Sequence, residues 1–262
     1  MRSPKDRRHL ACIKDRRHLA CIEDRRHLAC RAAKIEPMIF FLFSIVSYLI
    51  GMSSLFYFFW LVEFGNRGVP AFTPTLLLIN IAIFLIFPLQ HSLLPRKFVR
   101  ERMNPYVHRS FYVLTSGVAL WIVLLVWRPF GPFLYRDVMP WLFNILFYTS
   151  LILIIASTYA LNHSQMFGLY HGYAAWKKHP LPETKLETTG IYGIVRHPIT
   201  SLLIVALWSH ESLTAGRFLF NALFTIYALA GTVVEERSLV KEMGEEYREY
   251  RKKVPAFIPK LI

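Results

Sequence analysis

The feature that most restricts the fold is the long stretch from Met38 to Val62, which holds no charged side chain. As a helix rising about 1.5 Å per residue, such a stretch can cross the roughly 30 Å hydrocarbon core of a bilayer. Charged residues make up only 18% of the chain, whereas about a quarter of an average soluble domain is charged. The chain is therefore predicted to be an all-α integral membrane protein.

Further apolar stretches bring the prediction to about five to six transmembrane helices. The last two are short and flank the turn-like segment Ser212 to Gly216, so we expect them to form a helical hairpin packed among the other helices. The stretches after the first run from Thr75 to Leu94, Ser110 to Trp127, Met139 to Leu161, Ile199 to Trp208 and Phe218 to Val234.

The tail that follows the hairpin is predicted to form a cytoplasmic amphipathic helix. Its apolar residues recur at helical intervals, and Pro255 and Pro259 end the pattern. Two interpretations are open: the helix lies on the bilayer surface, or its aromatic face closes a pocket over the hairpin. The residues of the predicted face are Leu239, Met243, Tyr247, Tyr250 and Val254.

The placement of basic residues predicts the orientation in the membrane. Arg96, Lys97, Arg100, Arg102 and Arg109 lie between the second and third stretches, opposed by one acidic residue. Basic loops stay in the cytoplasm, so both termini are expected there, in the inner membrane if the source is bacterial. The net charge of +14 suits anionic membrane lipid as a partner. No RNA-binding or zinc-finger spacing supports nucleic acid as a partner.

Residues 1–37 stand apart from the rest. Residues 5–31 are three copies of a nine-residue unit of the type KDRRHLACI, which contains all three cysteines, Cys12, Cys21 and Cys30. The unit lacks the paired spacing of a closed zinc site, so no metal is predicted. We expect a non-essential extension, disordered or translated upstream of a true start at Met38, with a basic cytoplasmic tail as the alternative. Residues 38–262 are expected to form one membrane domain.

Two charged clusters lie at the ends of the predicted hairpin, Arg196-His197-Pro198 at its start and Glu235-Glu236 at its exit. Arginine can bind a carboxylate through two hydrogen bonds, histidine can exchange a proton near neutral pH, and a glutamate can hold an ammonium or a ribose. Either glutamate could instead pair with Arg196 and lock the hairpin. The histidines His163, His171 and His179 have no metal-ligand spacing and are expected to be solvated.

The order of these motifs resembles a known family. TTGIYGIVRHP at residues 188–198, an apolar hairpin, Glu235-Glu236 and Gly-x-x-Tyr-x-x-Tyr at residues 244–250 are similar to the isoprenylcysteine carboxyl methyltransferase superfamily of integral-membrane enzymes. Upstream, QHSL at residues 90–93, RSFYVL at 109–114 and MFGL at 166–169 look like its nurim branch, which includes bacterial methanethiol S-methyltransferases.

The resemblance implies methyl transfer from S-adenosylmethionine to a small thiol or a lipophilic acceptor, with methanethiol favoured and dimethyl sulfide as its product. Residues 38–161 would supply four spans and residues 162–262 the cofactor-binding part. Arg196, His197 and Glu236 would be catalytic. The residues expected to bind the cofactor are Gly190, Tyr192, Arg196, His197, Pro198, Glu235, Glu236, Tyr247 and Tyr250.

One departure leaves the acceptor open. Family members usually continue as RHPxYxG, whereas this chain has Ile199-Thr200-Ser201-Leu202. Carboxyl methylation of an isoprenylated or lipid-like substrate and a non-catalytic nurim-like role are therefore alternatives. The sequence does not reveal the oligomeric state.

Overall fold

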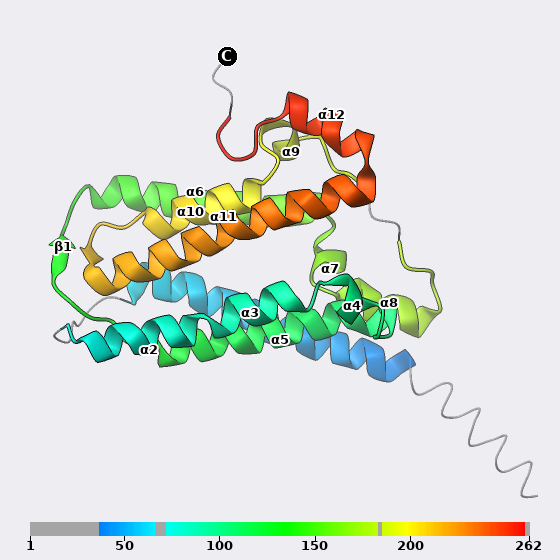
Figure 1. The fold of residues 1–262 in the computed structure, drawn as a ribbon, viewed down its shortest axis with the longest axis horizontal. Helices are drawn as coiled ribbons and strands as arrows, with labels where there is room; N and C mark the ends of the chain where they lie inside the picture. Colours follow the sequence, from blue (N-terminus) through cyan, green and yellow to red (C-terminus); the bar gives the residue numbers. More distant parts are fainter. Residues whose placement is uncertain (1–36, 66–71, 183–184, 260–262) are drawn as a thin grey trace, which may run out of the picture.

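A computed structural model describes residues 37–65, 72–182 and 185–259 (Figure 1). The repeats and nearly all of the predicted extension lie outside the described residues. The long helices are Pro37–Phe64, α5 (Pro105–Val126), α6 (Pro140–Ala160) and α11 (Ala215–Met243). The remaining elements are α2 (Pro74–Phe84), α3 (Ile86–Leu93), α4 (Lys97–Arg100), β1 (Phe133–Tyr135), α7 (His163–Met166), α8 (Leu169–Lys177), α9 (Ile191–Ile194), α10 (Pro198–Trp208), β2 (Leu213–Thr214) and α12 (Glu245–Lys253).

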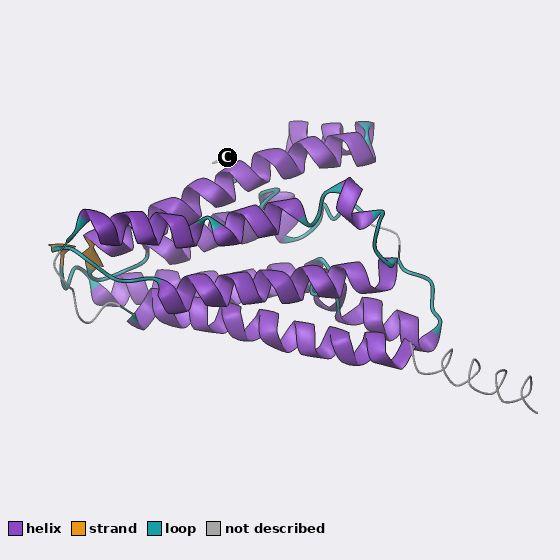
Figure 2. Ribbon diagram, turned by 60° about the horizontal axis from the view of Figure 1, so that its bottom comes forward, coloured by secondary structure: helices purple, strands orange, loops and turns teal. Residues whose placement is uncertain are grey.

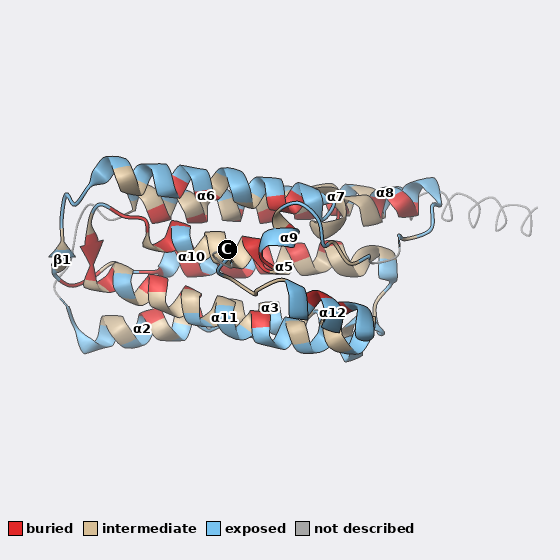
Figure 3. Cartoon of the chain, turned by 90° about the horizontal axis from the view of Figure 1, so that it is seen from above, coloured by how far each residue is buried: buried red, intermediate tan, exposed pale blue. Residues whose placement is uncertain are grey.

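Five helical segments of the described chain are long and apolar enough to cross a membrane, counting α2 and α3 as one. The shorter α10 pairs with α11, so the hairpin is confirmed. The all-α membrane fold is therefore confirmed. Large apolar side chains remain exposed on the outer helix faces, for example Phe56 at 75% and Ile152 at 66%, as lipid contact requires (Figure 3).

Proline explains where several helices begin and where one is interrupted. Pro74, Pro105, Pro140 and Pro198 each stand in the first turn of a helix, where a missing backbone N–H breaks no hydrogen bond. Pro88 instead lies inside the predicted second span. It cannot donate to the carbonyl of Phe84, and α2 ends at that residue.

The helices form two layers (Figure 1). In the upper layer α10 packs against α6 and α11, and in the lower one α5 packs against α3 and α8. Toward its C-terminal end α11 slopes away from α3, so the layers diverge on the side where α12 lies, as the turned view also shows (Figure 2).

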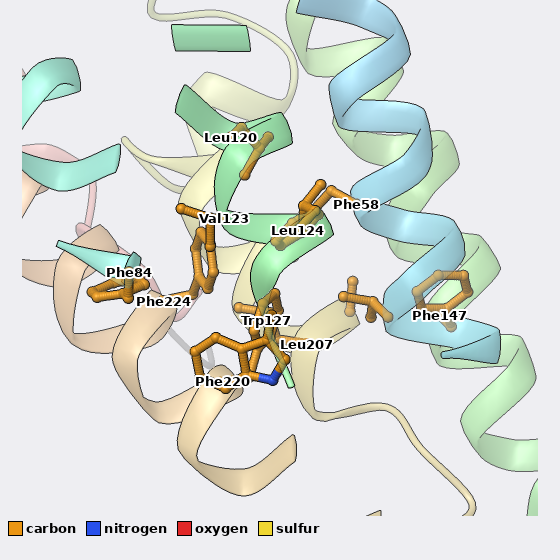
Figure 4. Packing of buried hydrophobic residues seen from close by; sticks show 12 residues of the cluster. Phe58, Phe84, Leu120, Val123, Leu124, Trp127, Phe147, Leu207, Phe220 and Phe224 are labelled. Carbon is orange, nitrogen blue, oxygen red and sulfur yellow. The ribbon is translucent and has the colours of Figure 1, made fainter. Parts of the chain in front are cut away.

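An aromatic core joins the two layers in the half away from α12. Phe220 and Phe224 of α11 contact Phe58 of the first long helix at ring-centroid distances of 5.8 and 5.1 Å. Val123 and Leu207, both 0% exposed, belong to the same buried cluster (Figure 4). This packing fixes the hairpin against the lower layer.

The hairpin turn contains a short strand that the sequence pattern did not predict. β2 pairs antiparallel with β1, with Phe133 opposite Thr214. A Cβ on Gly216 would lie 2.7 Å from the backbone nitrogen of Phe130, so only glycine permits this close approach. The turn is thereby held to the loop between α5 and α6.

The predicted tail helix is divided in two. Leu239 and Met243 belong to α11, which continues past the predicted end at Val234, whereas Tyr247 and Tyr250 belong to α12. The division falls at Gly244, whose φ of +62° lies in the left-handed region that favours glycine. The prediction of one continuous helical face was therefore wrong.

Candidate functional site

Backbone hydrogen bonds bring the two ends of the C-terminal region together. The N–H of Arg196 donates to the carbonyl of Pro255 at 2.9 Å, and that of His197 donates to Ala256 at 3.0 Å. Val195, just before them, is extended, so the chain runs straight from α9 into α10 beside the tail. The segment after α12 therefore lies against Arg196-His197-Pro198.

The guanidinium group of Arg196 is almost fully used within the protein. Its Nε and Nη2 donate to Oε1 of Glu236 at 2.9 and 2.6 Å. Its Nη1 donates to the carbonyls of Arg251 and Val254. The side chain is 8% exposed. Arg196 thus ties α11 and the end of α12 to the start of α10.

The carboxylate of Glu236 pairs with several donor side chains at once. Besides Arg196, its carboxylate lies 3.1 Å from Nε2 of His197 and 3.4 Å from Nε of Arg251. The hydroxyl of Tyr247 donates to it at 3.5 Å. The Glu236 side chain is 14% exposed, and a carboxylate so enclosed is stable only with such partners. The interpretation in which a glutamate pairs with Arg196 across the hairpin is confirmed.

Glu235 differs sharply from its neighbour. Its side chain is 61% exposed, and Oε2 lies 3.8 Å from Nδ1 of His197. It also interacts electrostatically with Arg109 of α5. His197, 7% exposed, is therefore held between an enclosed carboxylate on Nε2 and an open one on Nδ1. We call Arg196, His197, Glu235 and Glu236 the hairpin-end cluster.

Three tyrosines surround the hairpin-end cluster. The hydroxyl of Tyr250 donates to the carbonyl of Tyr192 at 2.5 Å, and that of Tyr192 donates to Ser157 of α6 at 3.3 Å. Burial raises the pKa of Tyr247 to about 12, and the negative charge of Glu236 contributes. Burial also raises the pKa of Tyr192 and of Tyr250. All three are neutral at pH 7.

The aromatic face of the tail is turned inward. Tyr247 is 1% exposed and Tyr250 is 7% exposed, although both lie on a short helix rich in charge. The aromatic face of the tail therefore packs against the segment before the hairpin, and the pocket beneath it stays a prediction.

The remaining predicted residues lie at the edges of the cluster. Gly190 is exposed, has a φ of +55° and leaves open space where a Cβ would stand. Pro198 is buried as the first residue of α10. In the segment that departs from the family pattern, the Ser201 hydroxyl donates to the carbonyl of Phe257 at 2.9 Å. Ser201 thus helps to hold the tail in place.

The structure also places residues that the sequence reasoning missed. Arg251 reaches Glu236, and the signal for it was its position one turn after Tyr247 on the same helical face. His163 was expected to be solvated, but its ring nitrogens contact the hydroxyls of Tyr48 at 3.0 Å and Thr158 at 2.9 Å. Within the described ranges no three metal-ligating side chains gather.

Comparison with known proteins gives the family. Over 218 residues the chain is 32% identical to a methanethiol S-methyltransferase of Pseudomonas deceptionensis, covering 75% of this chain and 81% of that protein. A methanethiol S-methyltransferase of Crocosphaera subtropica is 34% identical over 192 residues, covering 71% of this chain and 75% of its own length. Nurim of Bos taurus is 29% identical over 164 residues, or 56% of this chain and 62% of nurim. No family model and no solved structure matches the chain. The chain belongs to the methanethiol S-methyltransferase family, within the nurim branch of integral-membrane methyltransferases.

Proposed function

We propose that this membrane protein transfers the methyl group of S-adenosylmethionine to a small thiol, with methanethiol as the acceptor and dimethyl sulfide as the product. The relatives named methanethiol S-methyltransferase support this activity. One observation carries it to this chain: His197 is fixed between Glu236 and Glu235, and the Glu235 carboxylate stays open. A site of this kind has a fixed imidazole and a free anionic group for a cationic ligand.

Part of the set of residues predicted to bind the cofactor is suited to a sulfonium nucleoside. The exposed Glu235 carboxylate can receive an ammonium or a ribose hydroxyl pair. The open space at Gly190 allows a ligand to approach the backbone. Arg196, by contrast, already gives its donors to Glu236 and the tail carbonyls. We therefore assign binding to Glu235 and Gly190, and positioning to Arg196, His197 and Glu236.

When bound, S-adenosylmethionine supplies a methyl group on a sulfonium sulfur, and the C–S bond to that sulfur breaks, leaving its electron pair on the sulfur, as the acceptor thiolate forms the new bond. The protein must therefore align the two sulfurs and exclude water rather than provide a strong base. His197 holds the Glu235 carboxylate in position for the ligand. Tyr192, Tyr247 and Tyr250 form the cover that excludes water.

The position of the cluster in the membrane belongs to the same proposal. The basic residues of α4 and of the tail favour a cytoplasmic location for the hairpin-end cluster and both termini. A soluble cosubstrate then enters from the cytosol. A lipophilic thiol such as methanethiol reaches the site through the bilayer, with which the exposed apolar faces are in contact.

The proposal is tested with the full chain purified in detergent. Calorimetry should show binding of S-adenosylmethionine, and headspace analysis of cells supplied with methanethiol should show dimethyl sulfide. His197→Ala should weaken binding at least tenfold, whereas His179→Ala, at an exposed histidine outside the cluster, should not. Absence of S-adenosylmethionine binding by the wild type would refute the enzyme assignment. Binding without dimethyl sulfide, together with methylation of a prenylated cysteine, would refute the thiol assignment.

A further inference from the structure

One face of α11 lacks a side chain at its middle position, Gly231. Tyr227, Gly231 and Glu235 are spaced four residues apart and so share one side of the helix. A Cβ placed on Gly231 would meet no atom within 4 Å. Most other glycines within the described helices would place a Cβ in tight contact, as at Gly51, Gly117 and Gly172. The face of α11 between Tyr227 and Glu235 therefore borders open space.

The side chains at the two ends of this face, Tyr227 and Glu235, interact with the lower layer. The hydroxyl of Tyr227 lies 3.3 Å from that of Ser92, and its ring contacts those of Phe87 and His91 on α3 at 5.8 and 6.2 Å. Glu235, two turns further along, interacts electrostatically with Arg109 and Tyr112 of α5. The layers diverge along this part of α11 (Figure 1). The face of α11 that holds Gly231 is thus flanked by a side chain that contacts α3 at one end and by one that interacts with α5 at the other.

Those polar side chains form a connected group. Ring nitrogens of His91 lie 3.1 Å from the Ser116 hydroxyl and 2.6 Å from the Tyr112 hydroxyl. Ser116, Tyr112 and Arg109 follow one another on the same face of α5 at intervals of four and three residues. A polar path therefore leads from the apolar half of the protein toward Glu235.

Arg109 is the unusual member of the group. Its Nε donates to the carbonyl of Met166 at 2.6 Å, and its guanidinium carbon lies 5.3 Å from the centroid of the Tyr112 ring. Its two terminal nitrogens have no hydrogen-bond partner among the residues that the structure describes, and no carboxylate there lies within 4 Å of them. Glu235 acts on Arg109 electrostatically but forms no ion pair with it, and a cation held at a helix bundle without a direct ion pair is a mark of function.

His171 adds no second positive charge beside Arg109. Burial and the positive charge of Arg109 lower the pKa of His171 on α8 to about 4, so His171 is neutral at pH 7. Glu235 is the acidic side chain of α11 that faces this region, and its Oε2 also lies 3.8 Å from Nδ1 of His197. Arg109 therefore keeps a positive charge without an ion pair, and it acts on Glu235, which lies on the same face of α11 as Gly231.

We infer that the open space at Gly231 receives the acceptor thiol, with the thiolate sulfur paired to Arg109 and hydrogen-bonded by Tyr112, and the methyl group against Phe87 and Tyr227. This inference rests on the proposed function and assigns its second substrate. A cation beside a thiol lowers its pKa, so the thiol loses its proton to water before attack. The thiolate then lies on the α5 side of Glu235. On this side it faces the hairpin-end cluster, which holds the methyl donor.

The first test fills the space. Gly231→Leu should raise the KM for methanethiol at least tenfold, measured as dimethyl sulfide formation by the purified full chain, while the Kd for S-adenosylmethionine stays within twofold. Ala230→Leu adds the same side chain at the neighbouring exposed position and should change neither value. If Gly231→Leu does not fold, Gly231→Ala, which adds one methyl group, should raise the same KM by a smaller factor. An unchanged KM in a folded variant would overturn the inference.

The second test changes the cation. Arg109→Gln should raise the KM for methanethiol at least tenfold, and Arg109→Lys, which keeps the charge, should recover part of the loss. If either Gly231→Leu or Arg109→Gln instead weakens S-adenosylmethionine binding at least tenfold, the space belongs to the methyl donor and the inference is wrong. A wild-type protein that forms no dimethyl sulfide would refute the proposed function, and the acceptor assignment would fall with it.

Discussion

The hydroxyl of Tyr250 donates a 2.5 Å hydrogen bond to the backbone carbonyl of Tyr192, 58 residues earlier in the chain. This bond joins α12 to the short helix that precedes Arg196. Since Tyr192 in turn donates to Ser157 of α6, a chain of two hydrogen bonds connects the tail to a membrane helix. The cover over the hairpin-end cluster is thus fixed to the bundle at a buried point.

Tyr250→Phe tests whether this bond holds the cover closed. The carbonyl of Tyr192 would lose its partner in a buried place, which costs about 1–3 kcal/mol. We expect a lower Tm in detergent and an S-adenosylmethionine Kd raised about three- to tenfold by calorimetry. Tyr106→Phe removes a comparable hydroxyl-to-carbonyl bond of 3.1 Å at an exposed place and should leave that Kd unchanged. Equal behaviour of the two variants would contradict this role.

The pair formed by Arg196 and Glu236 should act as a structural lock. Removing one member of an enclosed ion pair typically costs about 3–5 kcal/mol, because the other charge is left unpaired. Glu236→Gln should therefore lower the Tm markedly, and Arg196→Met in the same background should cost less than it does alone. Thermal unfolding of the two single variants and the double variant measures this coupling. Additive losses would show that the two side chains do not act together.

The exposed pair Glu249 and Lys252 offers a matched comparison for that lock. The two side chains are 2.5 Å apart but 48% and 68% exposed. Exposed pairs contribute about 0–1 kcal/mol, so Glu249→Gln should change the Tm by no more than a degree or two. A large effect there would mean that the whole tail, rather than the enclosed pair, determines stability.

Periodicity and composition predicted the spans and the hairpin, because a bilayer requires long apolar helices whose lengths can be counted. Motif order predicted that Arg196, His197, Glu235 and Glu236 lie together, because the two ends of one hairpin must meet. The sequence could not show that Glu236 is enclosed while Glu235 is open, because adjacent residues on a helix point about 100° apart and periodicity did not say which one faces Arg196. The break at Gly244 was missed because its neighbours keep a helical spacing across it.

The contact between the first long helix and α5 depends on two glycines. A Cβ on Gly117 would lie 2.9 Å from the Cα of Gly51, and one on Gly51 would lie 2.7 Å from a methyl carbon of Val113. Small residues allow such close approach between membrane helices. Gly117→Ala should therefore lower the Tm, although alanine normally favours a helix over glycine by about 1 kcal/mol. Gly231→Ala, where the space is open, should keep or raise the Tm. A higher Tm for Gly117→Ala would disprove the contact.

His210 should make stability depend on pH. It is 4% exposed, and burial together with the positive charge of Arg217 lowers its pKa to about 3, compared with about 6.5 in an unfolded chain. Between these values the unfolded state binds a proton that the folded state does not. The free energy of unfolding therefore has its full value above pH 6.5 and decreases as the pH falls toward 3. The loss approaches about 1.4 kcal/mol per pH unit. His210→Gln should reduce the fall in Tm between pH 7.5 and 5, whereas His179→Gln, at an exposed histidine, should leave it as in the wild type. An identical fall in all three proteins would exclude His210 as the group responsible.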